Sequence, residues 1–235
     1  MKMPEANFIE MVPMIEKIRI LYAVLLTLLL TANAVVAQTG AAQAVQKTDV
    51  LEKGEVAESQ SPRQVVEEFQ QTLLEVMKQG KKLGYAGRYE KLANAVVKSH
   101  DVNKISRIVV GKAWSKATEE QRRKWVDVFT RLSIASYAHN FKDYSGESFK
   151  FESEEKTRRG RVIIHTYFVI PDDKDVKFDY LMAKKGDTWK IINIIANGVS
   201  DLALKRSEYS SILKKEGFDG LIAKISDKID NYAKL

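Results

Sequence analysis

The chain has 235 residues, a net charge of +7 and no cysteine. The lack of cysteine excludes disulfides, zinc–thiolate sites, thiol redox chemistry and cysteine nucleophiles. The basic balance favours anionic partners such as lipid headgroups or acidic proteins, or else serves only to keep the protein soluble.

The first element in chain order is an apolar stretch at residues 20–37, preceded by Lys17 and Arg19. It ends in small residues at Ala37, and its uninterrupted apolar core is shorter than the roughly 20 residues that span a bilayer. We therefore expect residues 1–37 to be a cleaved secretory signal peptide, with an uncleaved membrane anchor as the alternative. The exported chain keeps its charge of +7 and is expected in the periplasm, where nucleic acid is not an expected partner. Three methionines are candidate starts: Met1, Met11 and Met14.

Residues 38–60 contain no aromatic residue and few large apolar ones, so we expect a flexible leader. Residues 61–235 are expected to form one domain, which opens with Ser61 as a helix cap followed by proline. Apolar residues at helical spacing predict four helices, the last opened by a capping box. Their expected ranges are 62–79, 88–98, 102–110 and 119–141.

The apolar spacing then changes to alternation, which predicts strands at residues 148–155, 161–170, 176–184 and 188–196. Short turns between them indicate an antiparallel meander. Two final helices are expected at 201–215 and 218–233, separated by Gly217. The expected class is α+β, with a four-stranded curved antiparallel sheet packed against helices. Both faces of the strands carry apolar residues, which indicates ordinary core packing, a sheet covered on both faces, or a cavity on one.

Groups that could carry catalysis or bind metal are scarce. The histidines His100, His139 and His165 lack metal-ligand spacing, and no nucleophile or nucleotide-binding motif is present. We expect His100 to be charged at a helix end. We predict no enzyme activity, no catalytic residue, no metal and no cofactor. The enzymatic alternative is an isomerase using Asp179 with Tyr180, or His165 with Tyr167, although neither pair is expected to converge in one pocket.

Three segments carry a resemblance to a known family. Residues 110–122 (VGKAWSKATEEQR), followed by Phe129 and Tyr137, resemble the core motif of the MlaC (toluene-tolerance) family. Residues 189–200 (WKIINIIANGVS) and the motifs RSEY and GFDGL in the closing helices are also similar to that family, although Asn193 stands where it often carries an acid. The resemblance extends over residues 61–228. The segment 137–149 is closer to the hopanoid-biosynthesis-associated branch.

The resemblance implies a fold and a role. The implied fold is a nuclear-transport-factor-like sheet joined to a helical subdomain, with an apolar lipid pocket between them. The implied role is that of a monomeric periplasmic carrier, which takes phospholipid between the outer membrane and an inner-membrane ABC transporter. Hopanoid is the alternative cargo. A weaker alternative for the function is a scaffold protein without a pocket. The implied partners are an outer-membrane lipoprotein donor complex and the substrate-binding subunit of the transporter.

Strand alternation together with the resemblance selects candidate site residues. The expected lipid-binding residues are Tyr137, Phe141, Tyr144, Ile164, Phe168, Phe178, Tyr180, Met182, Ile194, Val199 and Leu202. Four basic residues around the capping box are expected to contact a partner or a headgroup: Lys112, Lys116, Arg122 and Arg123.

Overall fold

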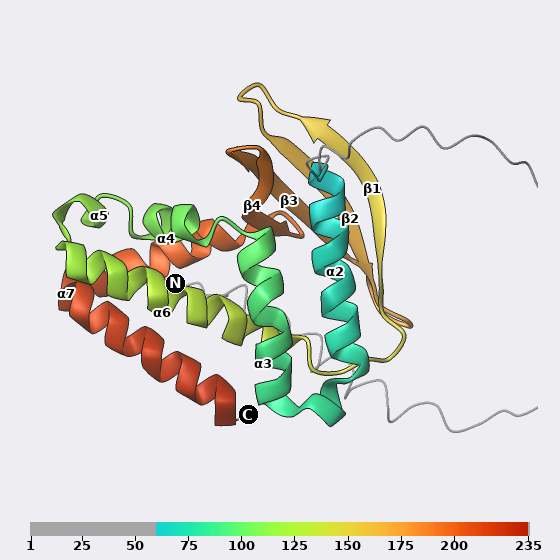
Figure 1. Ribbon diagram of the computed structural model, residues 1–235, viewed down its shortest axis with the longest axis horizontal. Coiled ribbons are helices and arrows are strands. Elements are labelled where there is room, and N and C mark those ends of the chain that lie inside the picture. Colours follow the sequence, from blue (N-terminus) through green and yellow to red (C-terminus); the bar gives the residue numbers. More distant parts are fainter. Residues whose placement is uncertain (1–59, 235) are drawn as a thin grey trace, which may run out of the picture.

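The computed structural model describes residues 60–234 (Figure 1). The expected signal peptide and nearly all of the expected leader lie outside the described residues. The helices are α2 (Pro62–Lys78), α3 (Gly80–Ser99), α4 (Val102–Val110), α5 (Ala113–Lys116), α6 (Glu119–Asn140) and α7 (Asp201–Lys234). The strands are β1 (Ser148–Lys156), β2 (Val162–Val169), β3 (Val176–Lys185), β4 (Thr188–Ala196) and β5 (Val199–Ser200).

Two helices begin at the caps expected from the sequence, and both caps are capping boxes, although the box was expected only at Thr118. At α2 the Ser61 hydroxyl accepts a hydrogen bond from the Gln64 amide, and the Gln64 side chain accepts one from the Ser61 amide. Thr118 and Gln121 make the same reciprocal pair at the start of α6. Each box satisfies backbone donors that the first turn leaves unpaired, so both helix starts are determined locally.

The start of α3 was wrongly expected at Arg88. The helix begins at Gly80, and Gly84 interrupts it with φ of 60°, a conformation that breaks the apolar spacing on which the expectation rested. Arg88 itself is buried, and it donates hydrogen bonds to the carbonyls of Ala138 at 2.7 Å and Gly80 at 3.0 Å. The short helix α5 was also not expected. The kink expected at Gly217 is confirmed, with φ of 71° inside α7.

The sheet is antiparallel with its strands in chain order, and it has five strands rather than the expected four. The added strand follows from the turn at Asn197 and Gly198, which have φ of 48° and 82°. Positive φ at both central residues is typical of a tight hairpin turn, and it pairs Val199 with Ala196. The chain thus makes one more short strand before α7 begins at Asp201.

Helices cover only one face of the sheet. On that inner face Ile164, Phe178 and Tyr180 are buried, and Gln70 of α2 donates a hydrogen bond to the Thr166 hydroxyl at 3.1 Å. Figure 1 shows α2 lying along this face, with α6 and α7 forming a second helical group beside it. Residues of the outer face stay partly exposed. The apolar residues on both faces therefore reflect one covered face and one that is half exposed.

The helical group has its own aromatic centre. Trp125 of α6 is fully buried, its ring lies edge-on to Tyr209 and Phe218 of α7, and its indole N–H donates to the Ser106 carbonyl at 2.9 Å. This packing fixes α4, α6 and α7 as one unit. Within residues 60–234, no helix has both the length and the apolar character needed to cross a membrane.

Candidate functional site

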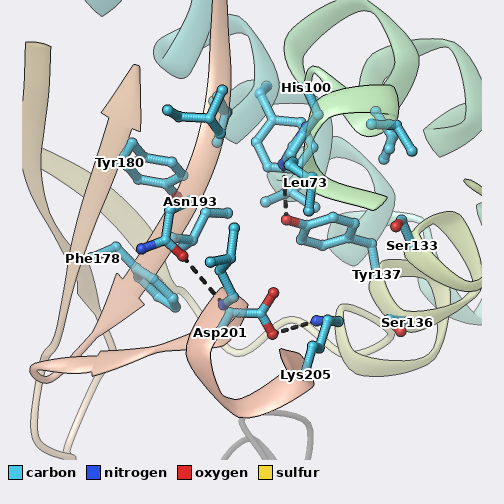
Figure 2. A pocket seen from close by; sticks show the side chains of 18 of the residues that line it. Leu73, His100, Ser133, Ser136, Tyr137, Phe178, Tyr180, Asn193, Asp201 and Lys205 are labelled. Carbon is cyan, nitrogen blue, oxygen red and sulfur yellow. Dashed lines mark hydrogen bonds and ion pairs between the residues drawn. The ribbon is translucent and has the colours of Figure 1, made fainter. Parts of the chain in front are cut away.

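A cavity of about 80 Å³ lies between the inner face of the sheet and the helices (Figure 2). Its walls come from α2, α3, α4, α6, β3, β4 and the first turn of α7. Six of the eleven residues expected to bind lipid line it: Tyr137, Phe141, Phe178, Tyr180, Ile194 and Leu202. The tertiary structure thus brings together candidates from α6, the sheet and α7.

The other five candidates lie elsewhere. Ile164 and Met182 are fully buried in the inner face of the sheet but do not line the cavity. Phe168 is buried among phenylalanines, whereas Tyr144 and Val199 are 41% and 38% exposed. Alternation identifies the face on which a strand residue lies but not its position along the cavity, which explains why some strand candidates lie on the inner face without lining the cavity.

Several wall residues were not among the candidates. Phe69 and Leu73 of α2, Val96 of α3 and Ile191 of β4 form a buried apolar floor. The apolar stripe of α2 was a visible signal, but helical spacing does not distinguish a cavity wall from a filled core.

Three hydrogen-bonded polar side chains, those of Ser99, His100 and Tyr137, lie in or next to the cavity wall. Ser99 Oγ lies 2.8 Å from His100 Nδ1, and His100 Nε2 lies 3.2 Å from the Tyr137 hydroxyl. The Ser99 hydroxyl also donates to the Ala95 carbonyl, so we assign the proton on His100 to Nδ1, with Nε2 accepting from Tyr137. All three side chains are thereby paired without charge.

The expectation of a charged His100 is wrong. Burial lowers the pKa of His100 to about 3, with a smaller contribution in the same direction from the charges of Lys205 and Lys190. The ring is therefore neutral at neutral pH. Burial also raises the pKa of Tyr137. An uncharged polar pair is compatible with an apolar cavity, because an isolated charge there would carry a large desolvation cost.

The side of the cavity formed by α6 and α7 is more polar. Asn193 donates to the Ser200 hydroxyl at 3.0 Å and accepts from the Leu202 amide at 3.2 Å, which anchors the start of α7. Asp201, the first residue of α7, forms an ion pair with Lys205, one turn further along the helix. Figure 2 shows this pair at one end of the cavity, with His100 at the other. Apart from the buried Phe129, the lining residues of α6 and of the first turn of α7 are partly accessible, whereas those of α2 and α3 are buried. The accessible side of the cavity therefore lies along α6 and α7.

The residues of the enzymatic alternative do not converge in the cavity. Asp179 and Tyr180 point to opposite faces, as expected, and Asp179 Oδ1 lies 2.7 Å from His165 Nδ1 on the outer face. His165 and Tyr167 do not converge in the cavity either: they are two residues apart on β2 and share its outer, half-exposed face. Tyr167 donates to Glu152 at 3.2 Å there. Among residues 60–234, no group of three potential metal-ligating side chains is placed to hold an ion.

The four basic candidates divide into two kinds. Lys112, Lys116 and Arg123 are exposed. Arg122 donates to the Trp114 carbonyl at 3.0 Å, and its guanidinium lies 5.5 Å from the centre of the Trp114 ring. Arg122 therefore holds α5 in place. The other three residues, Lys112, Lys116 and Arg123, extend into solvent, and we call these three the basic patch.

Comparisons with known proteins agree on one family. The family model described as MlaC protein matches residues 67–227. A relative from Haemophilus influenzae, the intermembrane phospholipid transport system binding protein MlaC, is 27% identical over 121 residues, which cover 50% of this chain and 56% of that protein. The toluene tolerance protein ttg2D of Pseudomonas putida is 23% identical over 186 residues, which cover 74% of this chain and 86% of that protein.

A similar fold is found in a solved structure. It is the phospholipid-binding protein of Ralstonia solanacearum in complex with a phospholipid, with a TM-score of 0.64 and 20% sequence identity. The superposition covers 72% of this chain and 97% of that one. At this identity the likeness establishes the shared architecture of sheet and helices.

Proposed function

Because the chain belongs to the MlaC protein family, we propose that it is a periplasmic lipid carrier that shuttles phospholipid between the outer membrane and an inner-membrane ABC transporter. The observation that carries the proposal is the cavity between the sheet and the α6–α7 unit, with its apolar floor and polar accessible side. Such a cavity suits an amphiphile that buries its chains and leaves its headgroup near water. The name of the Haemophilus influenzae relative and the phospholipid in the related structure support the same cargo class.

The free energies involved explain why a carrier is needed. Burying one methylene group is worth about 0.8 kcal/mol, so two acyl chains of about 15 methylenes would cost on the order of 20 kcal/mol to expose to water. A lipid therefore crosses an aqueous compartment rapidly only inside a dry cavity. Binding and release suffice for this role, which requires no acid, base or nucleophile.

The cavity must widen to take up such a lipid. Its volume of about 80 Å³ is well below the roughly 300–1,000 Å³ of sites that hold small molecules. Because α6 and α7 line the cavity on one side and β3 and β4 on the other, we infer that loading moves α6 and α7 away from the two strands.

The first test is the lipid content of the purified exported protein, measured by native mass spectrometry. We expect one phospholipid per chain in the wild type. Ser133→Phe should reduce occupancy at least several-fold, because Ser133 lines the cavity and a phenyl ring would occupy its limited space. Ser207→Phe, on the exposed side of α7, is the matched control and should keep wild-type occupancy.

Other outcomes of the same measurement would revise the proposal. A hopanoid in place of phospholipid would change the cargo and keep the carrier. A wild-type protein that never carries lipid, even after incubation with phospholipid vesicles, would contradict the proposed function.

A further inference from the structure

Lys205 has an unusual setting for a lysine. It lies in the cavity wall, its side chain is only 12% exposed, and it is the sole lysine or arginine among the lining residues that the structure describes. Its ammonium group is paired with Asp201, the residue one turn earlier on α7, whose side chain is 22% exposed. A lysine that serves only solubility would extend into water, so this placement calls for another explanation.

We propose that Lys205 binds the phosphate of the cargo lipid, and that Asp201 holds the lysine in place until the phosphate replaces it. The inference rests on the proposed function and adds the residue that distinguishes phospholipids from lipids without phosphate. A phosphodiester carries one negative charge, so the exchange keeps the net charge beside Lys205 unchanged. Asp201, being partly accessible, can turn towards water when it is displaced.

The position of Lys205 fits a headgroup contact. The lysine lies on the accessible side of the cavity, opposite the His100 end, where a headgroup would remain while acyl chains reach the apolar floor (Figure 2). Ser136 of α6 also lines the cavity, and its buried hydroxyl lies near that of Tyr232 but makes no hydrogen bond of normal geometry. Figure 2 shows Ser136 and Lys205 towards the same end of the cavity. A phosphate or glycerol oxygen placed there would satisfy both groups.

The backbone of α7 does not offer an alternative anion site. The amides of Leu202 and Ala203 already donate to Asn193 and to the Ser200 hydroxyl, at 3.2 Å each. Recognition of a negative group on this side therefore falls to the lysine side chain.

The test compares two ligands that differ in the phosphoglycerol headgroup. Delipidated protein is titrated with oleoyl lysophosphatidylglycerol and with oleoylglycerol, and the ratio of their affinities is measured. We expect the wild type to prefer the phosphate-bearing ligand by about tenfold, the size of one charge-assisted hydrogen bond. Lys205→Met should abolish this preference, and Asp201→Asn should increase it because the lysine no longer has a competing partner.

The opposite effects of the two variants separate recognition from structure. Both break the same ion pair, so a purely structural role would lower stability in both and shift the ligand ratio in neither. Lys228→Met is the matched control, because Lys228 is a half-buried lysine of α7 that pairs with Glu208 at 3.6 Å and does not line the cavity. It should keep the wild-type ratio.

Each other outcome counts against the inference. An unchanged ratio in folded Lys205→Met, or equal wild-type affinity for both ligands, would overturn it and leave the carrier function standing. Displacement of the lysolipid by inorganic phosphate at equal concentration would assign the site to free phosphate instead. Failure of the wild type to bind either ligand would overturn the proposed function and this inference together.

Discussion

At the scale of single residues, Tyr137 and His100 show how a polar pair can line an apolar cavity. Their rings both contact Phe69, with centroid distances of 5.0 Å and 4.9 Å, and their polar atoms bond to each other. The pair therefore contributes packing without leaving an unsatisfied group. This arrangement depends on His100 remaining neutral, which gives it a dependence on pH.

The first residue-scale prediction is that acid destabilises the fold through His100. The folded protein resists protonation of His100 down to about pH 3, whereas the unfolded chain takes up that proton near pH 6.5. Between these values the unfolded state binds more protons, so stability falls as pH decreases. The loss from this group should reach about 2 kcal/mol at pH 5, at 1.36 kcal/mol per pH unit.

Urea unfolding at pH 7.5 and pH 5 measures this effect. His100→Gln removes the titrating group, so the variant should lose less stability than the wild type between the two pH values, whatever its stability at pH 7.5. Equal losses in both proteins would contradict the buried, neutral assignment of His100.

At the scale of elements, the start of α3 depends on close contact with the chain that leaves α6. Gly80 is buried, and a Cβ placed on it would lie 1.8 Å from the Lys142 carbonyl oxygen. The Gly80 carbonyl also accepts a hydrogen bond from the buried Arg88 side chain. Gly80 thus joins α3 to the end of α6, beside Phe141 in the cavity wall.

We therefore predict that Gly80→Ala destabilises the protein by about 3 kcal/mol, since backbone atoms must shift to admit the methyl group. Lys81→Ala changes the next residue, which is exposed, and should stay within about 0.5 kcal/mol of the wild type. Chemical denaturation of both variants measures the difference. A Gly80→Ala protein as stable as Lys81→Ala would show that this contact is looser than the structure indicates.

At the scale of the whole molecule, the charge of the chain bears on docking. We propose that the basic patch steers the carrier towards acidic partners or anionic headgroups, because oriented charge accelerates encounter. The chain has 38 basic and 31 acidic residues, so its positive charge is not spread uniformly over the surface. Steering would therefore depend on a local cluster of basic residues such as this patch.

The corresponding prediction is that lipid transfer to acceptor membranes containing anionic lipid slows as salt concentration rises. Lys116→Glu combined with Arg123→Glu should slow transfer at low salt without emptying the cavity. Arg122 is left intact because it holds Trp114. Lys150→Glu, on the exposed side of β1, is the control. If the double variant transfers lipid at the wild-type rate at low salt, the basic patch has no steering role and is only a solvated surface.

A second prediction at this scale concerns export. We expect the mature protein to be recovered from the periplasm with its N-terminus near residue 38, because the apolar segment before Ala37 is short and ends in small residues. N-terminal sequencing of the fractionated protein measures this. An intact N-terminus on membrane-bound protein would favour the anchor instead.

The sequence by itself determined what depends on near neighbours. The caps at Ser61 and Thr118, the break at Gly217 and the four long strands follow from residues a few positions apart, and the family follows from motifs such as residues 110–122. Alternation also identified the buried face of β2 and β3.

Only the tertiary structure decided which buried residues line the cavity and which fill the core. Tyr137 meets His100 from 37 residues away, whereas Met182 and Ile164 lie on the correct face but outside the cavity. The pairing of Lys205 with Asp201 was visible as i,i+4 spacing, but its place in the cavity wall was not. The physical reason is that periodicity gives the direction of a side chain from its own element, while a cavity depends on how distant elements meet.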